Sequence, residues 1–174
     1  SKKLRLLGVT GTNGKTTTTT LVGCLFATVN RSTIVAGNIG TPLADRVAEI
    51  TKRSTVVLET SSYQLENIET FHPNLCAILN ITPDHLEHHG TIAAYVRAKA
   101  RLFENQRRSD TCVLNADDRW CVSLAKRCPS RVLFFSRRRL LKQGISYQNG
   151  EVVIRYRGRT EAFPLKWDPP GQQN

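Results

Sequence analysis

The chain has 174 residues, 40% of them hydrophobic, and its 25 Lys and Arg against 14 Asp and Glu give a net charge of +11. That is enough for one globular domain with its own core, and no stretch reaches the roughly 18 uninterrupted apolar residues that a membrane span needs. The basic residues are dispersed without an aromatic-interleaved stripe, so the charge does not favour nucleic acid as the partner.

Five cysteines occur without any C-x-x-C pair. Cys24, Cys76 and Cys112 fall inside apolar runs, so we expect them to be small buried hydrophobes in a reducing cytosol and the protein to be cytoplasmic. The chain starts without an initiator methionine and without a signal-peptide pattern. We therefore expect it to be a piece of a longer protein.

The first predicted strand, residues 4–10, leads into the glycine-rich stretch GVTGTNGKT at 8–16, and a helix is predicted over 16–29. Strand, glycine turn and helix form the layout of a phosphate-binding loop. The glycines let backbone N–H groups point inward, and the helix N-terminus adds positive potential. Lys15 can reach terminal phosphates, and the Thr16 hydroxyl can bind magnesium.

The loop does not match the strict pattern of glycine, four residues, then Gly-Lys-Ser/Thr. Counting back from Gly14 puts Val9 where the first glycine belongs. The loop is therefore either one residue longer, starting at Gly8, or a shorter variant starting at Gly11.

Strand-like and helix-like runs alternate up to residue 136, and the strands are apolar throughout rather than alternating. This predicts an α/β domain of the P-loop type, a mostly parallel sheet with helices on both faces. Further strands are expected at 32–36, 55–59, 75–81, 111–115 and 131–135, helices at 42–52, 91–106 and 117–126, and a loop or short helix at 61–71.

The pattern changes after residue 137. The runs 145–148 and 151–156 flank Asn149-Gly150, a strong hairpin signal, and a second turn at 157–158 leads into 160–165. We thus predict a P-loop ATPase core at 1–137, a small antiparallel β ribbon of the same domain at 138–167, and a boundary or linker at 168–174.

Ligands of open parallel sheets bind beyond the carboxyl ends of the strands. Polar residues follow five predicted strand ends, among them Asn38 and Asn80. Glu59 comes directly after the apolar run 55–58, beside the glycine loop, and is placed to hold the magnesium of a nucleotide.

Three histidines fall within five residues, and they could be metal ligands or part of a polar loop. His85 comes soonest after a strand end and is the best candidate ligand. For His88 and His89 a solvent-exposed loop is the favoured interpretation.

Lys99 lies in the apolar stripe of the helix predicted over 91–106, with Ile92, Val96 and Phe103 at helical spacing. A lysine there is costly unless it is paired, reaches solvent or becomes neutral. A neutral amine can take up carbon dioxide to form a carbamate, a carboxylate-like metal ligand. The alternative is a salt bridge to Glu59, Asp84 or Glu87, and the stripe alone does not decide.

Taken together, six motifs in this order closely resemble the central ATPase domain of the Mur ligase family, over nearly the whole chain. Each motif is weak alone, but the ordered set is specific. They are GTNGKT at 11–16, GNIG at 37–40, LETSSYQLE at 58–66, LNITPDHL at 79–86, YVRAK at 95–99 and LNADD at 114–118.

The resemblance implies an ATP-dependent amide-forming ligase of peptidoglycan synthesis. Within the family it is closest to the enzymes that phosphorylate the carboxylate of UDP-N-acetylmuramoyl-L-alanine to an acyl phosphate, which the amine of D-glutamate then attacks. The catalytic residues implied are Lys15, Glu59, His85 and Lys99, and the nucleotide contacts are Gly11, Thr12, Asn13, Gly14, Lys15, Thr16, Thr17 and Asn174. Two Mg²⁺ ions are implied, the first on Thr16 and Glu59 and the second on His85 and a carbamylated Lys99. The resemblance also implies that Asn38, Ser61 and Gln64 lie along the UDP-muramoyl substrate.

Family members also have an N-terminal uridine-nucleotide domain and a C-terminal amino-acid domain, and both are absent here. We therefore expect this piece to fold and to bind ATP weakly without completing ligation. Two rival readings stay open: a sibling ligase, such as folylpolyglutamate or cyanophycin synthetase, and a non-catalytic module that binds nucleotide or nucleic acid.

Overall fold

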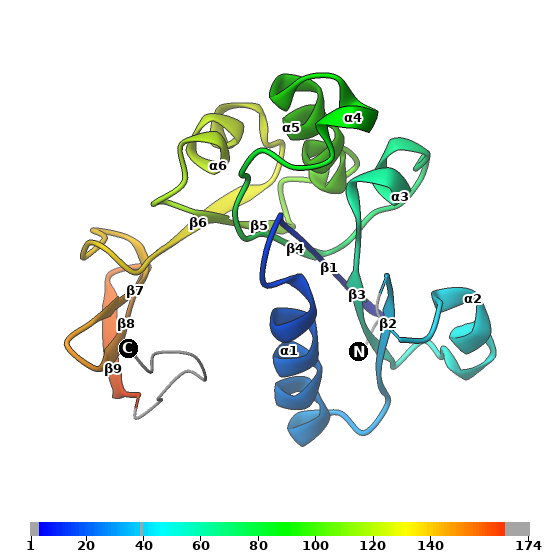
Figure 1. Cartoon of the computed structure of the whole chain (residues 1–174). Coiled ribbons are helices and arrows are strands. Elements are labelled where there is room, and N and C mark those ends of the chain that lie inside the picture. Colours follow the sequence, from blue (N-terminus) through cyan, green and yellow to red (C-terminus); the bar gives the residue numbers. More distant parts are fainter. Residues whose placement is uncertain (1–3, 39, 166–174) are drawn as a thin grey trace, which may run out of the picture.

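The computed structural model describes residues 4–38 and 40–165, which form a single nine-stranded sheet with helices on both faces (Figure 1). The strand order is β2-β3-β1-β4-β5-β6-β7-β8-β9, parallel from β2 to β7 and antiparallel over the last two pairings. This confirms the predicted α/β class. The strands are β1 (Arg5–Thr10), β2 (Thr33–Gly37), β3 (Thr55–Glu59), β4 (Leu75–Ile78), β5 (Thr111–Asn115), β6 (Arg131–Ser136), β7 (Gly144–Gln148), β8 (Glu151–Tyr156) and β9 (Arg159–Pro164).

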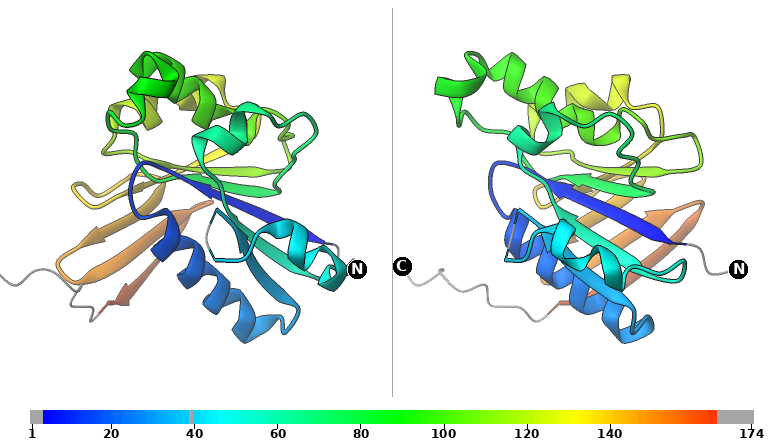
Figure 2. Two further views of the ribbon diagram at one scale, coloured as in Figure 1. Left: turned by 45° about the vertical axis from the view of Figure 1, so that its right-hand side comes forward. Right: turned by 90° about the vertical axis from the view of Figure 1, so that its right-hand side faces the viewer.

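Most helices cover one face of the sheet, and α1 covers the other (Figure 2). The main core lies under the larger group of helices, where Cys76, Ile78 and Leu114 of the central strands meet Tyr95 and Leu124. The α-helices are α1 (Lys15–Val29), α2 (Leu43–Arg46), α3 (Ser62–Glu66), α4 (Leu86–His89), α5 (Ile92–Ala100) and α6 (Arg119–Leu124).

Helix α1 lies close against the sheet because it presents small residues to it. A Cβ on Gly23 would lie 2.2 Å from the Cγ2 of Val35, so only glycine permits this approach. Thr19, the other buried residue of α1, faces the same way. Cys24 is exposed in consequence, which corrects the expectation that it is buried, whereas Cys76 and Cys112 are buried as expected.

Several helices are shorter than predicted. The run predicted at 42–52 divides into α2 and a 3₁₀ turn, Val47–Glu49, and α5 passes into a 3₁₀ turn, Arg101–Phe103. Helix α6 starts later than expected because the carboxylate of Asp118 caps it by accepting from the backbone N–H groups of Trp120 and Cys121.

Strand β4 ends at Ile78, three residues before the predicted end at 81. Asn80 leaves the sheet and turns toward the glycine loop, where its carbonyl accepts from the N–H of Thr12. The shortened strand thus becomes a support for the loop.

The C-terminal ribbon continues the main sheet. Strand β7 pairs in parallel with β6 through Phe135↔Ile145 and Ser136↔Ser146. Its two tight turns have positive φ at both central residues, 51° and 80° at Asn149-Gly150 and 52° and 77° at Arg157-Gly158, which is the signature of type I′ hairpins. The segment predicted as a linker, 168–174, lies outside the described residues.

Among the residues that the structure describes, no helix combines the length and the apolar character needed to cross a membrane.

Candidate nucleotide and metal site

The glycine loop occupies the four residues between β1, which ends at Thr10, and α1, which begins at Lys15. Gly8 lies inside β1, where a Cβ would stand 2.7 Å from Leu102 Cδ1. Gly8 is therefore a packing glycine, and the loop is the shorter variant that starts at Gly11. Gly14 has φ 80° and ends the loop in the left-handed conformation that glycine tolerates best.

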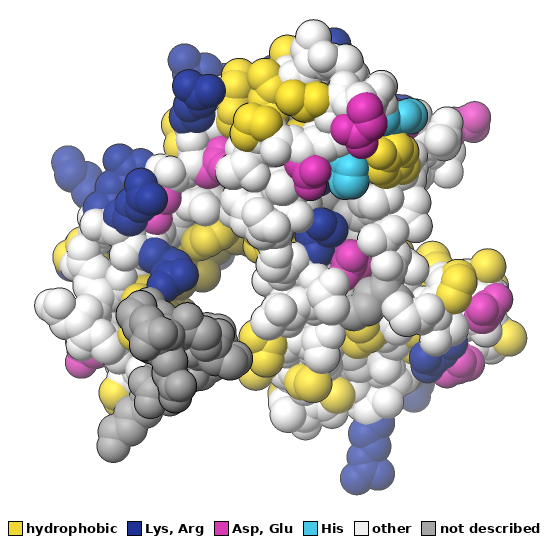
Figure 3. All heavy atoms as spheres, viewed as in Figure 1, with side chains coloured by type: hydrophobic (Ala, Val, Ile, Leu, Met, Phe, Trp, Pro, Cys, Tyr) yellow, Lys and Arg dark blue, Asp and Glu magenta, His cyan; other side chains and the backbone are white. Residues whose placement is uncertain are grey.

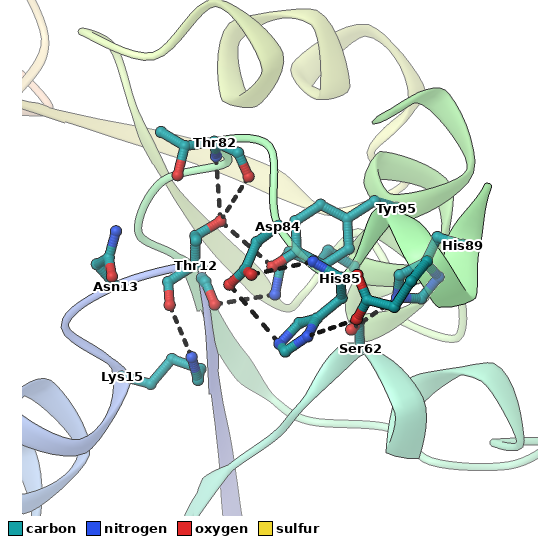
Figure 4. Close-up of polar contacts among 12 residues, drawn as sticks. Thr12, Asn13, Lys15, Ser62, Thr82, Asp84, His85, His89 and Tyr95 are labelled. Atoms are coloured by element: carbon teal, nitrogen blue, oxygen red, sulfur yellow. Dashed lines mark hydrogen bonds and ion pairs between the residues drawn. The ribbon is translucent and has the colours of Figure 1, made fainter. Parts of the chain in front are cut away.

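Hydrogen bonds to the segment that follows β4 fix the conformation of the glycine loop. The N–H groups of Thr12 and Asn13 donate to the backbone and side-chain oxygens of Asn80 at 2.9 and 2.8 Å, and Asn80 Nδ2 donates back to Asn13 O at 3.0 Å. Thr12 Oγ1 also bonds both backbone groups of Thr82 (Figure 4). Asn80 was not among the predicted site residues, although its place after a strand end was the signal for it.

Glu59 is a buried carboxylate without a basic partner. It is 2% exposed, and its oxygens accept from the Thr16 hydroxyl at 2.8 Å and from Asn38 Nδ2 at 3.1 Å. Both donors are neutral, and no lysine or arginine in the described part of the chain lies within 4.0 Å of it. A buried charge of this kind is costly alone, and carboxylate and hydroxyl oxygens are the ligands that magnesium prefers. The residues present therefore fit a magnesium ion.

Lys99 is buried beneath the loop at 1% exposure. Its Nζ donates to the carbonyl of Gly11 at 2.9 Å and to Thr10 Oγ1 at 3.5 Å, and it lies 4.5 Å from the ring centroid of Tyr95. Among the described residues no carboxylate lies within 4.0 Å of this nitrogen, so of the alternatives that the sequence left open the salt bridge to Glu59, Asp84 or Glu87 is not formed. Burial, reinforced by the positive charge of Lys15, lowers the pKa of Lys99 to about 7.

Tyr95 joins the two halves of the site and was missed by sequence reasoning. Its hydroxyl lies 3.3 Å from Thr12 Oγ1 on the loop, while its ring lies beneath Lys99. The ring is 1% exposed, and burial raises the pKa of Tyr95. An aromatic residue four positions before Lys99 on the same predicted helix was the available signal.

A cavity of about 440 Å³ opens beside the loop, and Lys15, His85 and Lys99 all reach it. Figure 3 shows basic, acidic and histidine side chains next to one another on this face, above α1. The structure thus brings the predicted residues of five separate segments to one space. The remaining lining residues are Asn38, Ser61, Ser62, Tyr63, Gln64 and Tyr95.

His85 is held at the start of α4 with φ 51°, in the left-handed region. Its ring lies edge-on to Tyr63, with centroids 5.3 Å apart, and its two nitrogens each lie 3.6 Å from a carboxylate oxygen, of Asp84 and of Glu87. The side chain is 43% exposed and lines the cavity.

Ser61 and Gln64 have a structural role besides bordering the cavity. They form a capping box at the start of α3: Ser61 Oγ accepts from Gln64 N–H, and Gln64 Oε1 accepts from Ser61 N–H. Thr17 lies exposed in the first turn of α1. Asn174, the last predicted nucleotide contact, lies outside the described residues.

His88 and His89 lie in α4 and not in a loop, which corrects the prediction. The expected exposure to solvent holds for His88, whose side chain is 43% exposed, but not for His89. The His89 side chain is only 1% exposed and packs against Tyr95, with ring centroids 5.0 Å apart. Both histidines contact the carboxylate of Glu66.

A short glycine loop between β1 and α1, with a buried carboxylate at the end of the adjacent strand, defines a P-loop-type α/β domain. The sequence identifies the family within this class, because the family model of the Mur ligase middle domain matches residues 9–174. The chain belongs to this family.

A relative from Clostridioides difficile, UDP-N-acetylmuramoylalanine–D-glutamate ligase, is 48% identical over 148 residues, which cover 85% of this chain and 33% of the relative. The chain therefore spans about a third of the length of the curated relatives it matches.

Solved Mur ligases have the same fold. The structure of a UDP-N-acetylmuramoyl-L-alanyl-D-glutamate–2,6-diaminopimelate ligase matches with a TM-score of 0.69 and 28% identity, covering 94% of this chain and 40% of that one. The MurF ligase of Thermotoga maritima, solved in complex with ADP, matches with a TM-score of 0.65 and 21% identity, covering 93% and 40%, and shows the fold alone.

Proposed function

We propose that this chain is the ATP-binding middle part of a ligase that joins D-glutamate to UDP-N-acetylmuramoyl-L-alanine in peptidoglycan synthesis. Relatives that are 48% identical to this chain are named UDP-N-acetylmuramoylalanine–D-glutamate ligase. The observation that supports it most directly is the buried Glu59 with Thr16 at the end of the glycine loop, a donor set suited to nucleotide-bound magnesium.

In this proposal the loop residues and Lys15 bind the phosphates of ATP, and Thr16 with Glu59 holds the first magnesium ion. His85 and Lys99, which line the same cavity, would hold a second magnesium ion. Bound magnesium would neutralise phosphate oxygens and lower the repulsion that opposes attack by the substrate carboxylate. Asn38, Ser61 and Gln64 line the path of the UDP-muramoyl substrate, as do residues of flanking domains in the same polypeptide.

Lys99 serves the second ion as a carbamate. Its buried Nζ borders the cavity beneath Gly11, and a pKa of about 7 leaves a large neutral fraction near neutral pH. The neutral amine adds to the carbon of CO₂ and releases one proton, so a neutral group becomes a carboxylate-like anion. Carbon-13 NMR with labelled bicarbonate tests this step, since a carbamate resonance that persists in Lys99→Met would contradict it.

The activity is tested on the complete polypeptide by phosphate release from ATP. We expect release to require both D-glutamate and UDP-N-acetylmuramoyl-L-alanine, and we expect Glu59→Gln to slow it by about 100-fold or more because a magnesium ligand is lost. Glu161→Gln is the matched control, since Glu161 is an exposed carboxylate on β9, away from the cavity.

Two results would overturn the proposal. One is equal turnover with other acceptor amino acids in place of D-glutamate, which would favour a sibling ligase. The other is D-glutamate-dependent release by the isolated 174-residue chain, which would show that no further domains are required.

A further inference from the structure

A second group of metal-binding side chains lies where α3 and α4 meet, outside the lining of the cavity. Glu66 closes α3, and His88 and His89 close α4. His88 Nε2 lies 2.8 Å from Glu66 Oε2, and His89 Nδ1 lies 2.9 Å from Glu66 Oε1. Each carboxylate oxygen therefore faces a different imidazole. We refer to these three residues as the α3–α4 cluster.

We propose that the α3–α4 cluster binds a divalent d-block cation such as Zn²⁺, separately from the magnesium ions of the ligase reaction. Two imidazole nitrogens and one carboxylate form a ligand set that Zn²⁺ favours and that Mg²⁺, which prefers oxygen, does not. The three donor atoms lie within 4.8 Å of one another. Zinc bonds are about 2 Å long, so a small rotation of His88, which is 43% exposed, completes the site.

His89 is oriented for this role before any ion arrives. Its side chain is 1% exposed and lies between the rings of Tyr63 and Tyr95, at centroid distances of 5.7 and 5.0 Å. Its outer nitrogen, Nε2, lies 3.0 Å from Ser62 Oγ (Figure 4). A metal-bound imidazole is commonly held through its second nitrogen in this way. Without an ion, Nδ1–H donates to the Glu66 carboxylate and Nε2 accepts from the Ser62 hydroxyl. A bound ion would replace the Nδ1 proton, and Nε2–H would then donate to Ser62 Oγ.

The outer side of the cluster is open to solvent, because Glu66 is 35% exposed. Water can therefore supply the remaining coordination positions. A bound ion would cross-link α3 to α4, and α4 begins directly after His85. The site would thus hold the wall of the cavity in place without touching the reacting groups.

The test is metal binding by the complete polypeptide after treatment with a chelator, in excess magnesium so that the oxygen-rich sites are filled. Cys24→Ser is the background, since Cys24 is an exposed free thiol and thiolates are zinc ligands. We expect about one equivalent of Zn²⁺ by calorimetry and a Co²⁺ visible spectrum without thiolate charge transfer. His88→Ala and Ser62→Ala should each weaken Zn²⁺ binding by about tenfold or more.

Glu87→Gln is the matched control, because it changes an exposed carboxylate on α4 outside the cluster and should leave Zn²⁺ affinity unchanged. Equal affinity in His88→Ala, or no stoichiometric binding, would overturn the proposal and leave the cluster as a hydrogen-bonded ion pair. Loss of Zn²⁺ binding in His85→Ala with His88→Ala unaffected would also overturn it, by assigning the ion to the cavity. His88 is a surface residue, so thermal unfolding without metal should match the background variant.

Discussion

At the scale of single residues, the site contains two buried ionisable side chains that do not pair with each other. Glu59 contacts Thr16 and Asn38, and Lys99 contacts the backbone of Gly11. An unpaired buried charge is unfavourable, and proteins retain such groups mainly where a ligand completes the charge balance. A ligand that pairs with these groups would relieve the cost of burying them, and this relief would strengthen its binding.

Lys99 should make the stability of the protein depend on pH in a defined direction. Its pKa is about 7 in the folded state and about 10.4 in the unfolded chain. Between these values the unfolded state binds more protons, so the free energy of unfolding rises with pH. From about pH 6 to about pH 9 this contribution is about 2–3 kcal/mol.

The measurement is urea unfolding of the chain and of Lys99→Met at both pH values, in buffers free of carbon dioxide. The variant should lack this contribution and should be the more stable protein at the lower pH. Parallel pH profiles for the two proteins would contradict the assignment.

Gly37 should be far less tolerant of substitution than Gly40, although both have positive φ, 115° and 57°. A Cβ on Gly37 would lie 2.2 Å from the carbonyl oxygen of Glu59, whereas one on Gly40 would meet nothing within 4 Å. We expect Gly40→Ala to cost about 1 kcal/mol and Gly37→Ala to cost more than about 3 kcal/mol, as measured by chemical denaturation. A similar loss of unfolding free energy in the two variants would contradict this, and would show that β2 can move away from β3 to make room for the methyl group.

At the scale of elements, the C-terminal ribbon contains two turns of the same type with different sequences. Asn149-Gly150 has the preferred residues of a type I′ turn, whereas Arg157-Gly158 places an arginine at φ 52°. The second turn therefore carries strain that the first avoids.

Reciprocal exchange at these turns should change stability in opposite directions. Arg157→Asn should raise the free energy of unfolding by about 0.5–1 kcal/mol, and Asn149→Arg should lower it by a similar amount. Thermal or urea unfolding gives both values. A destabilised Arg157→Asn would mean that the stacking of Arg157 on Tyr156, 5.3 Å from the ring centroid, outweighs the backbone strain.

At the scale of the whole molecule, the net charge of +11 remains the feature with the least connection to the site. The basic residues that the structure describes lie on many elements, and of these Lys15 and Lys99 line the cavity. We attribute any affinity for polyanions to this general charge and not to a dedicated surface.

Binding to DNA should therefore be weak and should disappear near physiological salt, because each released counterion makes it salt-dependent. Lys15→Ala should abolish ATP binding and leave the residual DNA binding unchanged. Fluorescence anisotropy with labelled DNA and labelled nucleotide measures both. Tight DNA binding that persists at physiological salt would favour the nucleic-acid module instead.

The sequence alone determined those features that depend on neighbouring residues. Strands β3 and β5 have the predicted bounds, because uninterrupted apolar runs specify buried parallel strands locally. The hairpin at Asn149-Gly150 and the order of strand, loop and helix at Gly11–Thr16 follow from residues adjacent in the chain.

Only the tertiary structure decided the contacts between distant segments. The helical stripe left open how a buried Lys99 is accommodated. In the structure its amine donates to the carbonyl of Gly11, 88 positions away, and forms no salt bridge among the described residues. Helix α4 has four residues, too few for a periodic pattern, and exists because His89 packs on Tyr95 and meets Glu66. The start of the glycine loop is likewise ambiguous in the sequence, and the packing of Leu102 against Gly8, in the tertiary structure, decides it. Local propensity selects the elements, whereas burial and charge balance between distant segments select the site.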